Sequence, residues 1–576
     1  MSLNNLHPGL IMICFGCLIL LLPEKCRRVL SVAAPVTAFA AFWQLNENSS
    51  LTYHVSDQIT LHLIDAGRLA VVFLMVFCII AIIAAVYSLD LQTKIEAAMC
   101  CFYVGSNMGI VLSGDLITLV VFWEISAFTS AYLIYARHCR KSSRAAFRYL
   151  LVHAFGGNML LAGVIIHIFR YGTAITNISA VHDASFWLIL IGVGVNAAVP
   201  PLNGWIADAY PEATIPGTVY LGSYTTKAAI YVMIRFFSGT EILIWVGAFM
   251  AIYAACMALM ENDLRRLLSY HIVSQLGMMV ASLAIGSRVG IDGASAHAVT
   301  NIFFKGVLLM GVGAIIHCTG KRKITELGGL YWKMPVVAIC FLLSSMSIAG
   351  FPFLSGFASK ALIMQGLHEA GLTIPALLIT VAGVGTLLSI TLKINYFVFF
   401  TGAEKDIPTK KVPYSIQIAM IAGTAMSFVI GAKPEVLYNR LAYQTMVDPF
   451  TLPHILEYVA IIIGGTIPFA LYIYRIAPHD EISIDFDWFY RRPLFRLVKA
   501  ASGWIYSFME WCSGKSLHNV QYLGSHIGNP YLWTKNSSSV RIRSLSFENE
   551  DRWIGTVITQ TLAALLIMVI GAIVII

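Results

Sequence analysis

The stretch AGRLAVVFLMVFCIIAIIAAVYSL, residues 66–89, contains one charged residue, Arg68. As a helix it is long enough to cross a hydrocarbon layer about 30 Å thick. Similar runs recur along nearly the whole chain of 576 residues, which is 58% hydrophobic and 12% charged, with a mean hydropathy of +0.76. Membrane β-barrels show short alternating segments instead. The sequence therefore predicts an all-α, polytopic membrane protein and excludes a soluble globular domain.

Runs of the length that a bilayer demands predict about 16 transmembrane helices. They lie near residues 9–22, 29–44, 66–89, 94–112, 115–136, 146–169, 184–203, 214–235, 241–260, 264–286, 292–317, 334–350, 358–400, 413–432, 455–475 and 553–576. Pro200 and Pro201 end one candidate, and the run 358–400 is too long for one span and contains Gly366, Gly371 and Pro375. Broken helices at membrane depth are typical of transporters, where they line a transport path.

The basic loops predict the topology, because positively charged loops stay in the cytoplasm. In our helix count all of them fall on one side of the membrane: 25–28, 137–144, 265–266, 321–323 and 410–411. Both termini then face the periplasm, and the acidic stretch 47–65 also lies outside. We expect a multi-pass protein of the cell inner membrane.

Residues 476–552 are the exception, a segment with many charges that the same rule places in the cytoplasm before the last apolar run. Its part 488–511 mixes Arg and Lys with Trp, Phe, Leu and Ile, as an amphipathic helix lying on a membrane or a partner does. A plain helical linker is an equally good interpretation.

No feature of the sequence indicates a cofactor, a metal or a nucleic acid. The net charge of +8 comes mostly from Lys and Arg in short loops, where they orient the protein. Cysteines such as Cys100 and Cys101 fall inside apolar runs and are interpreted as small packing residues. There is no Walker loop and no GxGxxG motif that leads a strand. The first apolar run precedes its positive charges, so we expect a retained helix rather than a cleaved signal.

Several ionisable residues lie within the predicted spans, where each costs about 2.5–3.5 kcal/mol even on the lenient insertion scale. They are Glu124, Arg148, Lys227, His297, Lys305, Lys360 and Lys393. Glu124 and Lys305 are central in their runs, and His297 lies about two helical turns before Lys305, on the same face. Arg148 and Lys393 lie nearer the cytoplasmic ends, where snorkelling explains them. A row of lysines and a histidine along the membrane plane suits stepwise proton transfer.

Five motifs in this order resemble the antiporter-like family shared by Mrp-type cation/proton antiporters, the membrane arm of respiratory complex I and membrane-bound hydrogenases. They are FWEIS (122–126), PPLNGWIADAYPEA (200–213), DLRRLLSYHIVSQLG (263–277), HAVTNIFFKGVLL (297–309) and AGFPFLSGFASK (349–360). The match covers roughly residues 60–400. The resemblance implies two inverted five-helix repeats, each with a broken helix.

The resemblance also implies roles for the buried charges. Glu124 corresponds to the glutamate of the first half-channel, Lys305 to the central lysine and Lys360 to the terminal lysine on the second broken helix. His297 matches the histidine before the central lysine, and Lys227 matches a lysine of some members. The implied division of the chain is 1–112 (N-terminal helices), 113–260 and 261–432 (the two repeats), 433–475 (C-terminal core helices), 476–552 (cytoplasmic amphipathic segment) and 553–576 (last helix).

This sequence departs from the family pattern at one important position. The lysine expected to pair with Glu124 should precede PPLNGW, and Asn196 stands there, in GVGVNAAVPP. Asn301 also stands where many relatives have a second histidine. Either Lys227 serves Glu124 instead, or the first half-channel is altered or silent.

The function that we predict is proton translocation by a subunit of a multisubunit Mrp-type cation/proton antiporter, exchanging protons for a monovalent cation, most readily Na⁺. The stretch IDFDWFYRRPLFR (484–496) resembles the tail of Mrp D-type subunits and their hydrogenase relatives, which favours an Mrp-type complex over complex I. The expected partners are other membrane subunits and the lipid bilayer, and the chain is not expected to be an enzyme by itself. Three alternatives remain: a pumping subunit of a hydrogenase or NADH-type oxidoreductase, the membrane subunit of an inorganic-carbon uptake complex, and a structural subunit.

Overall fold

The computed structural model describes residues 6–56, 60–401 and 407–473, with scattered positions up to 508. The chain divides into two compact units, one formed by 1–54 and 60–488 and the other by 55–59 and 489–576. All elements named below belong to the first unit. The predicted span 553–576 and nearly all of the segment 476–552 lie outside the described residues.

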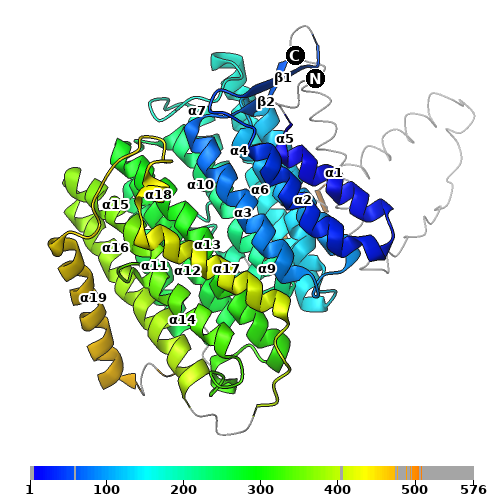
Figure 1. The fold of residues 1–576 in the computed structure, drawn as a ribbon. Coiled ribbons are helices and arrows are strands. Elements are labelled where there is room, and N and C mark those ends of the chain that lie inside the picture. Colours follow the sequence, from blue (N-terminus) through cyan, green and yellow to red (C-terminus); the bar gives the residue numbers. More distant parts are fainter. Residues whose placement is uncertain are drawn as a thin grey trace, which may run out of the picture. The chain divides into compact units, whose positions relative to one another are not determined.

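The elements in chain order are α1 (Pro8–Leu21), α2 (Arg27–Phe42), β1 (Ser50–His54), β2 (Thr60–Asp65), α3 (Arg68–Ser88), α4 (Lys94–Leu112), α5 (Leu116–Tyr135), α6 (Arg140–Tyr171), α7 (Ala184–Asn196), α8 (Gly204–Ala209), α9 (Ile215–Ser223), α10 (Thr225–Phe237), α11 (Ile242–Met260), α12 (Leu264–Ala284), α13 (Arg288–Thr319), α14 (Pro335–Ala349), α15 (Ser355–Glu369), α16 (Thr373–Thr386), a π-helix (Leu387–Phe400), α17 (Tyr414–Ala432), α18 (Glu435–Tyr438) and α19 (Leu452–Leu471). Figure 1 shows them as a bundle in which the long helices run side by side.

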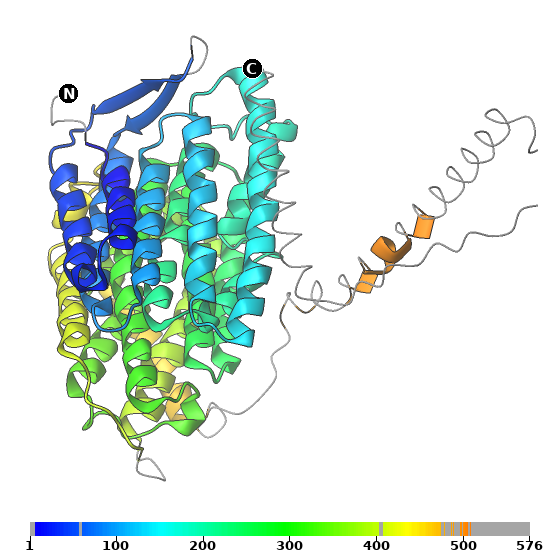
Figure 2. The same ribbon diagram turned by 90° about the vertical axis from the view of Figure 1, so that its right-hand side faces the viewer.

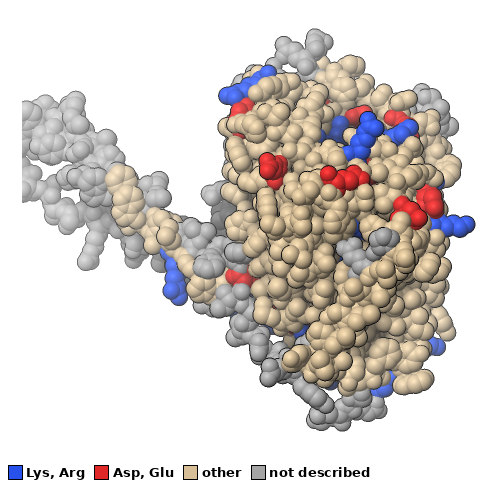
Figure 3. Space-filling view, turned by 90° about the vertical axis from the view of Figure 1, so that its left-hand side faces the viewer, with Lys and Arg blue, Asp and Glu red and all other residues tan. Residues whose placement is uncertain are grey.

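Ten helices of the described residues are long and apolar enough to cross a membrane, and the three shorter apolar helices α1, α7 and α14 accompany them. On the face drawn in Figure 3, most charged side chains lie toward the upper and lower ends, and the broad area between them is almost free of charge. The protein is a multi-pass, all-α membrane protein, as the hydropathy predicts.

Helices α12 and α13 form the centre of the first unit. The apolar window of α12 is wholly buried and that of α13 is 94% buried, against 39% for α6 and α17 and 18% for α19. Helix α13 packs against α12, α14, α15, α17 and the short α9. Side chains of α12 and α13 are therefore surrounded by protein, so a polar group on either helix needs a partner within the protein.

The helices are interrupted at three places. Helix α7 ends at Asn196 and α8 begins at Gly204, so the predicted span 184–203 stops early, next to Pro200 and Pro201. The backbone of Tyr224 (φ −112°, ψ −70°) separates α9 from α10. Helix α14 ends at Ala349 and α15 begins at Ser355.

The third interruption lies outside the run 358–400, where the sequence placed the break. That run does split, but the split near Gly371 is a turn between two antiparallel helices rather than a break within one span. The broken span is α14 with α15. Gly350 begins its break with a left-handed backbone (φ 96°), which glycine adopts without steric cost.

A β-hairpin between α2 and α3 was not predicted. Strands β1 and β2 pair antiparallel, with Ser50 opposite Asp65 and His54 opposite Thr60. Asp115, the N-cap of α5, accepts a hydrogen bond from the backbone N–H of His62 (2.6 Å) and fixes β2 to the start of that helix. Figure 2 shows the hairpin at one end of the helices of the first unit.

The structure joins all five basic loops into one end of the first unit. Arg322 forms ion pairs with Glu212 and Asp263, and Arg137 also pairs with Glu212 (2.7 Å). Lys410 donates its backbone N–H to Cys318 (3.0 Å). The loop at Arg28 is joined to α17 through Asp90, which pairs with Arg28 (3.0 Å) and accepts from Ser415 (3.1 Å). The charge bias that predicts the topology therefore has a structural counterpart, although which side is cytoplasmic stays a prediction.

Two residues of the IDFDWFYRRPLFR stretch, Asp485 and Trp488, lie within the described part of the first unit. Asp485 is buried and accepts hydrogen bonds from Tyr253 of α11 and from Tyr270 of α12 (2.8 Å). Apolar side chains farther along, Leu497, Trp504 and Phe508, are exposed, and residues 499–504 are helical. The amphipathic character predicted for 488–511 stays a prediction, because half of that stretch is not described.

Candidate functional site

Lys305 lies on α13, and its ammonium group has no hydrogen-bond partner among the described residues. Its side chain is fully buried. Two turns earlier on the same helix, His297 is held at both ring nitrogens. Nδ1 lies 2.9 Å from Ser359 Oγ and Nε2 lies 3.0 Å from Gln275 Oε1. The predicted pair on α13 thus combines a fixed histidine with an unpartnered lysine.

Lys360 lies on α15, immediately after the interruption of α14. Its Nζ donates to the carbonyl oxygens of Ile348 (2.7 Å) and Ala349 (3.2 Å), the last two residues of α14. Free carbonyls and the negative end of the helix dipole make a helix C-terminus a favourable site for a cation. Ser359, next to Lys360 in the sequence, contacts His297, so residues of α15 connect the interruption between α14 and α15 to α13.

A small cavity lies beside Lys360. Its free volume is about 20 Å³, enough for one water molecule. Side chains of α12, α15, α16 and α19 line it, among them Met278, Thr380 and Tyr458. Lys360 thus has a space on one side that can hold water and helix carbonyls on the other.

Lys227 and Lys393 also donate to helix ends. Lys227 lies on α10, just after the break at Tyr224, and its Nζ donates to the carbonyl of Gly222 in α9 (2.8 Å). Lys393 donates from the π-helix to the carbonyls of Leu259 (2.8 Å) and Glu261 (3.0 Å) at the end of α11. Lys305 therefore differs from Lys227, Lys360 and Lys393, since each of these three stabilises its charge on carbonyls at the end of a helix.

Glu124 lies on α5, partly buried, and its carboxylate points at the backbone of α6 at Gly157, where a Cβ atom would overlap it. No hydrogen bond or ion pair joins it to Lys227 or to Asn196 within the described residues. The suggestion that Lys227 serves Glu124 instead is therefore not supported by the contacts of Lys227.

The partner of Asn196 is a residue that the sequence analysis did not single out. His153 of α6 is 2% exposed, and its Nδ1 lies 2.8 Å from Asn196 Oδ1. Its ring contacts Tyr149 and Trp205, with centroids 4.0 and 4.6 Å apart. A buried histidine in a predicted span was itself the signal that could have found it.

His271 of α12 is a second residue that the sequence analysis missed, although it stands in the quoted motif SYHIVSQLG. It is fully buried, and its Nε2 lies 2.7 Å from Ser389 Oγ in the π-helix. One turn later on the same helix, Gln275 contacts His297. His271 and Gln275 thus lie one turn apart on α12, where the first contacts the π-helix and the second contacts His297 of α13.

The remaining candidates have ordinary partners or none. Arg148 forms a two-point ion pair with Asp208 (2.7 and 2.8 Å), so it pairs instead of only extending toward the surface. Asn301, at the position of a second histidine in many relatives, is buried, and neither polar atom of its side chain has a partner among the described residues.

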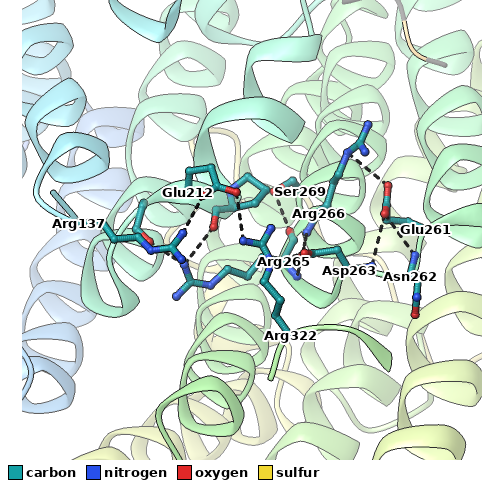
Figure 4. Close-up of polar contacts among 11 residues, drawn as sticks. Arg137, Glu212, Glu261, Asn262, Asp263, Arg265, Arg266, Ser269 and Arg322 are labelled. Carbon is teal, nitrogen blue, oxygen red and sulfur yellow. Dashed lines mark hydrogen bonds and ion pairs between the residues drawn. The ribbon is translucent and has the colours of Figure 1, made fainter. Parts of the chain in front are cut away.

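Figure 4 shows the polar contacts at the loop end. Buried Arg265, in the first turn of α12, donates to the carbonyls of Pro211 (3.2 Å) and Ala213 (2.6 Å). Burial lowers the pKa of Arg322, but the carboxylates of Asp263 and Glu212 more than offset this effect, so its pKa lies above the usual value. Arg322 therefore stays charged and links the loop after α8 to the start of α12.

No group of His, Cys, Asp and Glu side chains suited to a metal ion occurs among the described residues, and the described cysteines are free. Cys14 and Cys17 have the CxxC spacing on α1, but both are exposed and unbonded.

A family model described as NADH:quinone oxidoreductase/Mrp antiporter, transmembrane, matches residues 113–389. This range contains the candidate site residues from Glu124 to Lys360. Over this range the chain belongs to that family and is an antiporter-like membrane protein.

Its relatives include an A-type chain of the Na⁺/H⁺ antiporter of Alkalihalophilus pseudofirmus, 31% identical over 66% of this chain and 53% of the relative. Another is a chain of a probable K⁺/H⁺ antiporter of Rhizobium meliloti, 32% identical over 54% of this chain and 33% of the relative. The chain thus spans about half or less of the length of these relatives. A chain of the Mrp complex from Dietzia sp. DQ12-45-1b has the same fold, with a TM-score of 0.70, 21% identity and coverage of 83% of this chain and all of that one.

Proposed function

We propose that the protein moves protons across the membrane as one component of a multisubunit Mrp-type cation/proton antiporter. The observation that carries the proposal is the fully buried, unpartnered ammonium of Lys305, set between lysines that cap helix ends. A cation buried without an acceptor is costly, and membrane proteins retain such groups where they serve a transport path.

The contacts of Lys227, Lys305 and Lys360 support different roles for these three lysines. The neutral amine of Lys305 accepts a proton and becomes an ammonium ion, whose charge then disfavours a second positive charge on its neighbours. Lys227, at the break between α9 and α10, and Lys360, at the break between α14 and α15, exchange protons while their helix-end carbonyls stabilise the charged form. The water-sized cavity beside Lys360 offers a place where a proton can leave or enter.

The interruptions at α7–α8 and α14–α15 support two inverted repeats over 113–260 and 261–432, with the basic loop end in the cytoplasm and both termini in the periplasm. The relatives named as components of Na⁺/H⁺ and K⁺/H⁺ antiporters favour a monovalent cation as the exchanged ion. The D-type character predicted from residues 484–496 belongs to the same proposal.

The test replaces Lys305 with Met, which is similar in length but cannot bind a proton. In membrane vesicles that contain the complete native complex, we expect cation-driven proton movement, followed with a pH-sensitive dye, to fall to background. The matched control is Lys433→Ala, since Lys433 is an exposed lysine after α17. Normal exchange by Lys305→Met in an intact complex would overturn the proposal.

Tagging the protein in its native host and identifying the chains that purify with it tests the kind of complex. Small hydrophobic antiporter subunits support the Mrp assignment. Soluble iron–sulfur, nickel or zinc proteins would replace it with a redox-driven or carbon-uptake complex.

A further inference from the structure

We propose that His153 is the proton-binding group at the first interruption, where Asn196 itself cannot titrate. The proposal deepens the proposed function, on which it rests, and it assigns a role to a residue outside the family motifs quoted above. It begins from the contact of His153 Nδ1 with Asn196 Oδ1 (2.8 Å), because an amide oxygen only accepts hydrogen bonds. Nδ1 therefore carries the hydrogen, and Nε2 keeps a free lone pair.

The groups around His153 leave the lone pair of Nε2 free and hold the ring in place. Nε2 is buried and has no hydrogen-bond partner among the described residues. The rings of Tyr149 and Trp205 both contact the imidazole, and they also contact each other (centroids 5.4 Å apart), so together they restrict its rotation. The Trp205 indole N–H is used elsewhere, since it donates to the carbonyl of Val195 at the end of α7 (3.0 Å). A histidine with one nitrogen fixed and the other free is ready to accept one proton.

Glu124 of α5 reaches the helix of His153 one turn farther along. His153 and Gly157 are four residues apart on α6 and therefore share a face, and the Glu124 carboxylate rests on Gly157. Other titratable groups on the elements packed around His153 include Tyr149 on its own helix, Tyr210 after α8, which contacts Trp205, and Asp208 on α8, which Arg148 neutralises. Helix α5 also carries Tyr132 and Tyr135 nearer its C-terminal end. Helix α7 contributes no titratable side chain. Glu124 is thus the acidic group placed to exchange a proton with His153.

A row of polar side chains leads from His153 toward Lys227. It runs through Tyr149, Ser130, Ser126, Asn107, Tyr103 and Thr225, two positions before Lys227. Tyr149 donates to Ser130 (2.9 Å), Asn107 donates to Ser126 (3.0 Å), and the Tyr103 and Thr225 hydroxyls are 2.6 Å apart. Ser130 reaches Ser126, and Asn107 reaches Tyr103, only through backbone carbonyls (2.7 Å each). In the proposed step, an N–H bond forms at Nε2 as Glu124 gives up its proton. That bond then breaks as the proton passes to the neutral amine of Lys227 through water molecules that bridge the gaps between these side chains.

The test uses His153→Gln in the complete complex. Gln can still donate a hydrogen bond to Asn196, so a purely structural role survives this change, whereas proton binding does not. We expect proton exchange to fall on the order of a hundredfold, the usual range for losing a positioned acid–base group. The matched control is His167→Gln, a buried histidine on the same helix outside the row, which should retain normal exchange.

Asn196→Asp provides a second measurement that does not depend on losing activity. A carboxylate facing Nδ1 stabilises the imidazolium ion, so the alkaline limb of the pH profile should move up by about one unit. Normal exchange by His153→Gln, or an unshifted profile for Asn196→Asp, overturns the role of His153. If His153→Gln or Asn196→Asp fails in this way but Lys305→Met still loses exchange, only the role of His153 is overturned. Normal exchange by Lys305→Met overturns the proposed function itself.

Discussion

The buried side chain of Lys305 lowers the stability of the fold while serving the proposed proton transport. Its ammonium group is fully buried on α13 without a hydrogen-bond partner among the described residues, whereas Lys227, Lys360 and Lys393 reach carbonyls at helix ends. Removing a buried polar group that lacks a partner gains the free energy spent on its desolvation. Function and stability should therefore separate at this residue.

We predict that Lys305→Met raises the free energy of unfolding by about 2–3 kcal/mol, the insertion cost of a central lysine. The measurement is the thermal midpoint of the purified protein in detergent. Lys360→Met is the contrasting variant, because it leaves the carbonyls of Ile348 and Ala349 without their donor and should lower the midpoint. A lower midpoint for Lys305→Met would mean that the ammonium group has a stabilising partner, such as bound water.

At the scale of single residues, the sequence identified the buried charges but not their partners. The positions of Glu124, Lys305 and Lys360 within apolar runs were visible in the sequence, because charges in such runs are rare. The contact of Asn196 with His153 was not, since it joins residues 43 positions apart on two helices. His153 lies outside the quoted motifs and was given no weight, whereas His271 was missed although it stands within DLRRLLSYHIVSQLG.

At the scale of elements, the interruption between α14 and α15 depends on Lys360. The last carbonyls of α14 lack partners within their own helix, as at every helix end, and Lys360 satisfies two of them. Ser347, Ser355 and Ser427 close the other side of the break, with the Ser355 and Ser427 hydroxyls 2.6 Å apart. The break is thus held by a polar cluster that includes the proposed proton carrier.

We predict that Lys360→Met loosens this break. Amide hydrogen exchange should accelerate in peptides that cover residues 346–354 and stay unchanged in α17, because only the former lose a side-chain contact at the end of α14. The Ser427→Ala variant removes a hydroxyl from the same cluster and keeps Lys360, so its exchange should change less. Equal protection in Lys360→Met and the unaltered protein would show that backbone packing alone holds the break.

The breaks themselves were only partly readable from the sequence. Pro200 and Pro201 marked the end of α7 correctly, because proline cannot continue a helix interior. The break at Tyr224 directly follows Gly222 and Ser223, a pair at which helices often kink, but the sequence analysis gave that pair no weight. The hairpin at residues 50–65 was missed, although Ser50–His54 and Thr60–Asp65 are short polar-apolar segments typical of strands.

At the scale of the whole first unit, the two proposed repeats are joined at the loop end. Arg322, which follows α13, forms ion pairs with Glu212, which follows α8, and with Asp263, which begins α12. Arg137 reaches the same Glu212 from the loop between α5 and α6. The side chain of Arg322 is 31% exposed, so its pairs are partly shielded from solvent. Such pairs couple more strongly than fully exposed ones.

We predict that Arg322→Gln lowers the free energy of unfolding by about 1–2 kcal/mol, because two carboxylates lose their shared cation. A double-mutant cycle with Glu212→Gln should give a coupling free energy of at least about 0.5 kcal/mol. The control is Arg170→Gln, which breaks the more exposed pair of Arg170 with Asp183 (2.8 Å) between neighbouring helices of the first repeat.

The same variant also tests whether the link matters for transport. If the repeats must move relative to each other, cutting the link at Arg322 changes the exchange rate, whereas Arg170→Gln leaves it unaltered. If the helices are static and protons move only between side chains, Arg322→Gln lowers stability without changing the rate per folded complex. A coupling free energy near zero in the cycle would show that Arg322 and Glu212 act independently, so the loop end would not join the repeats energetically.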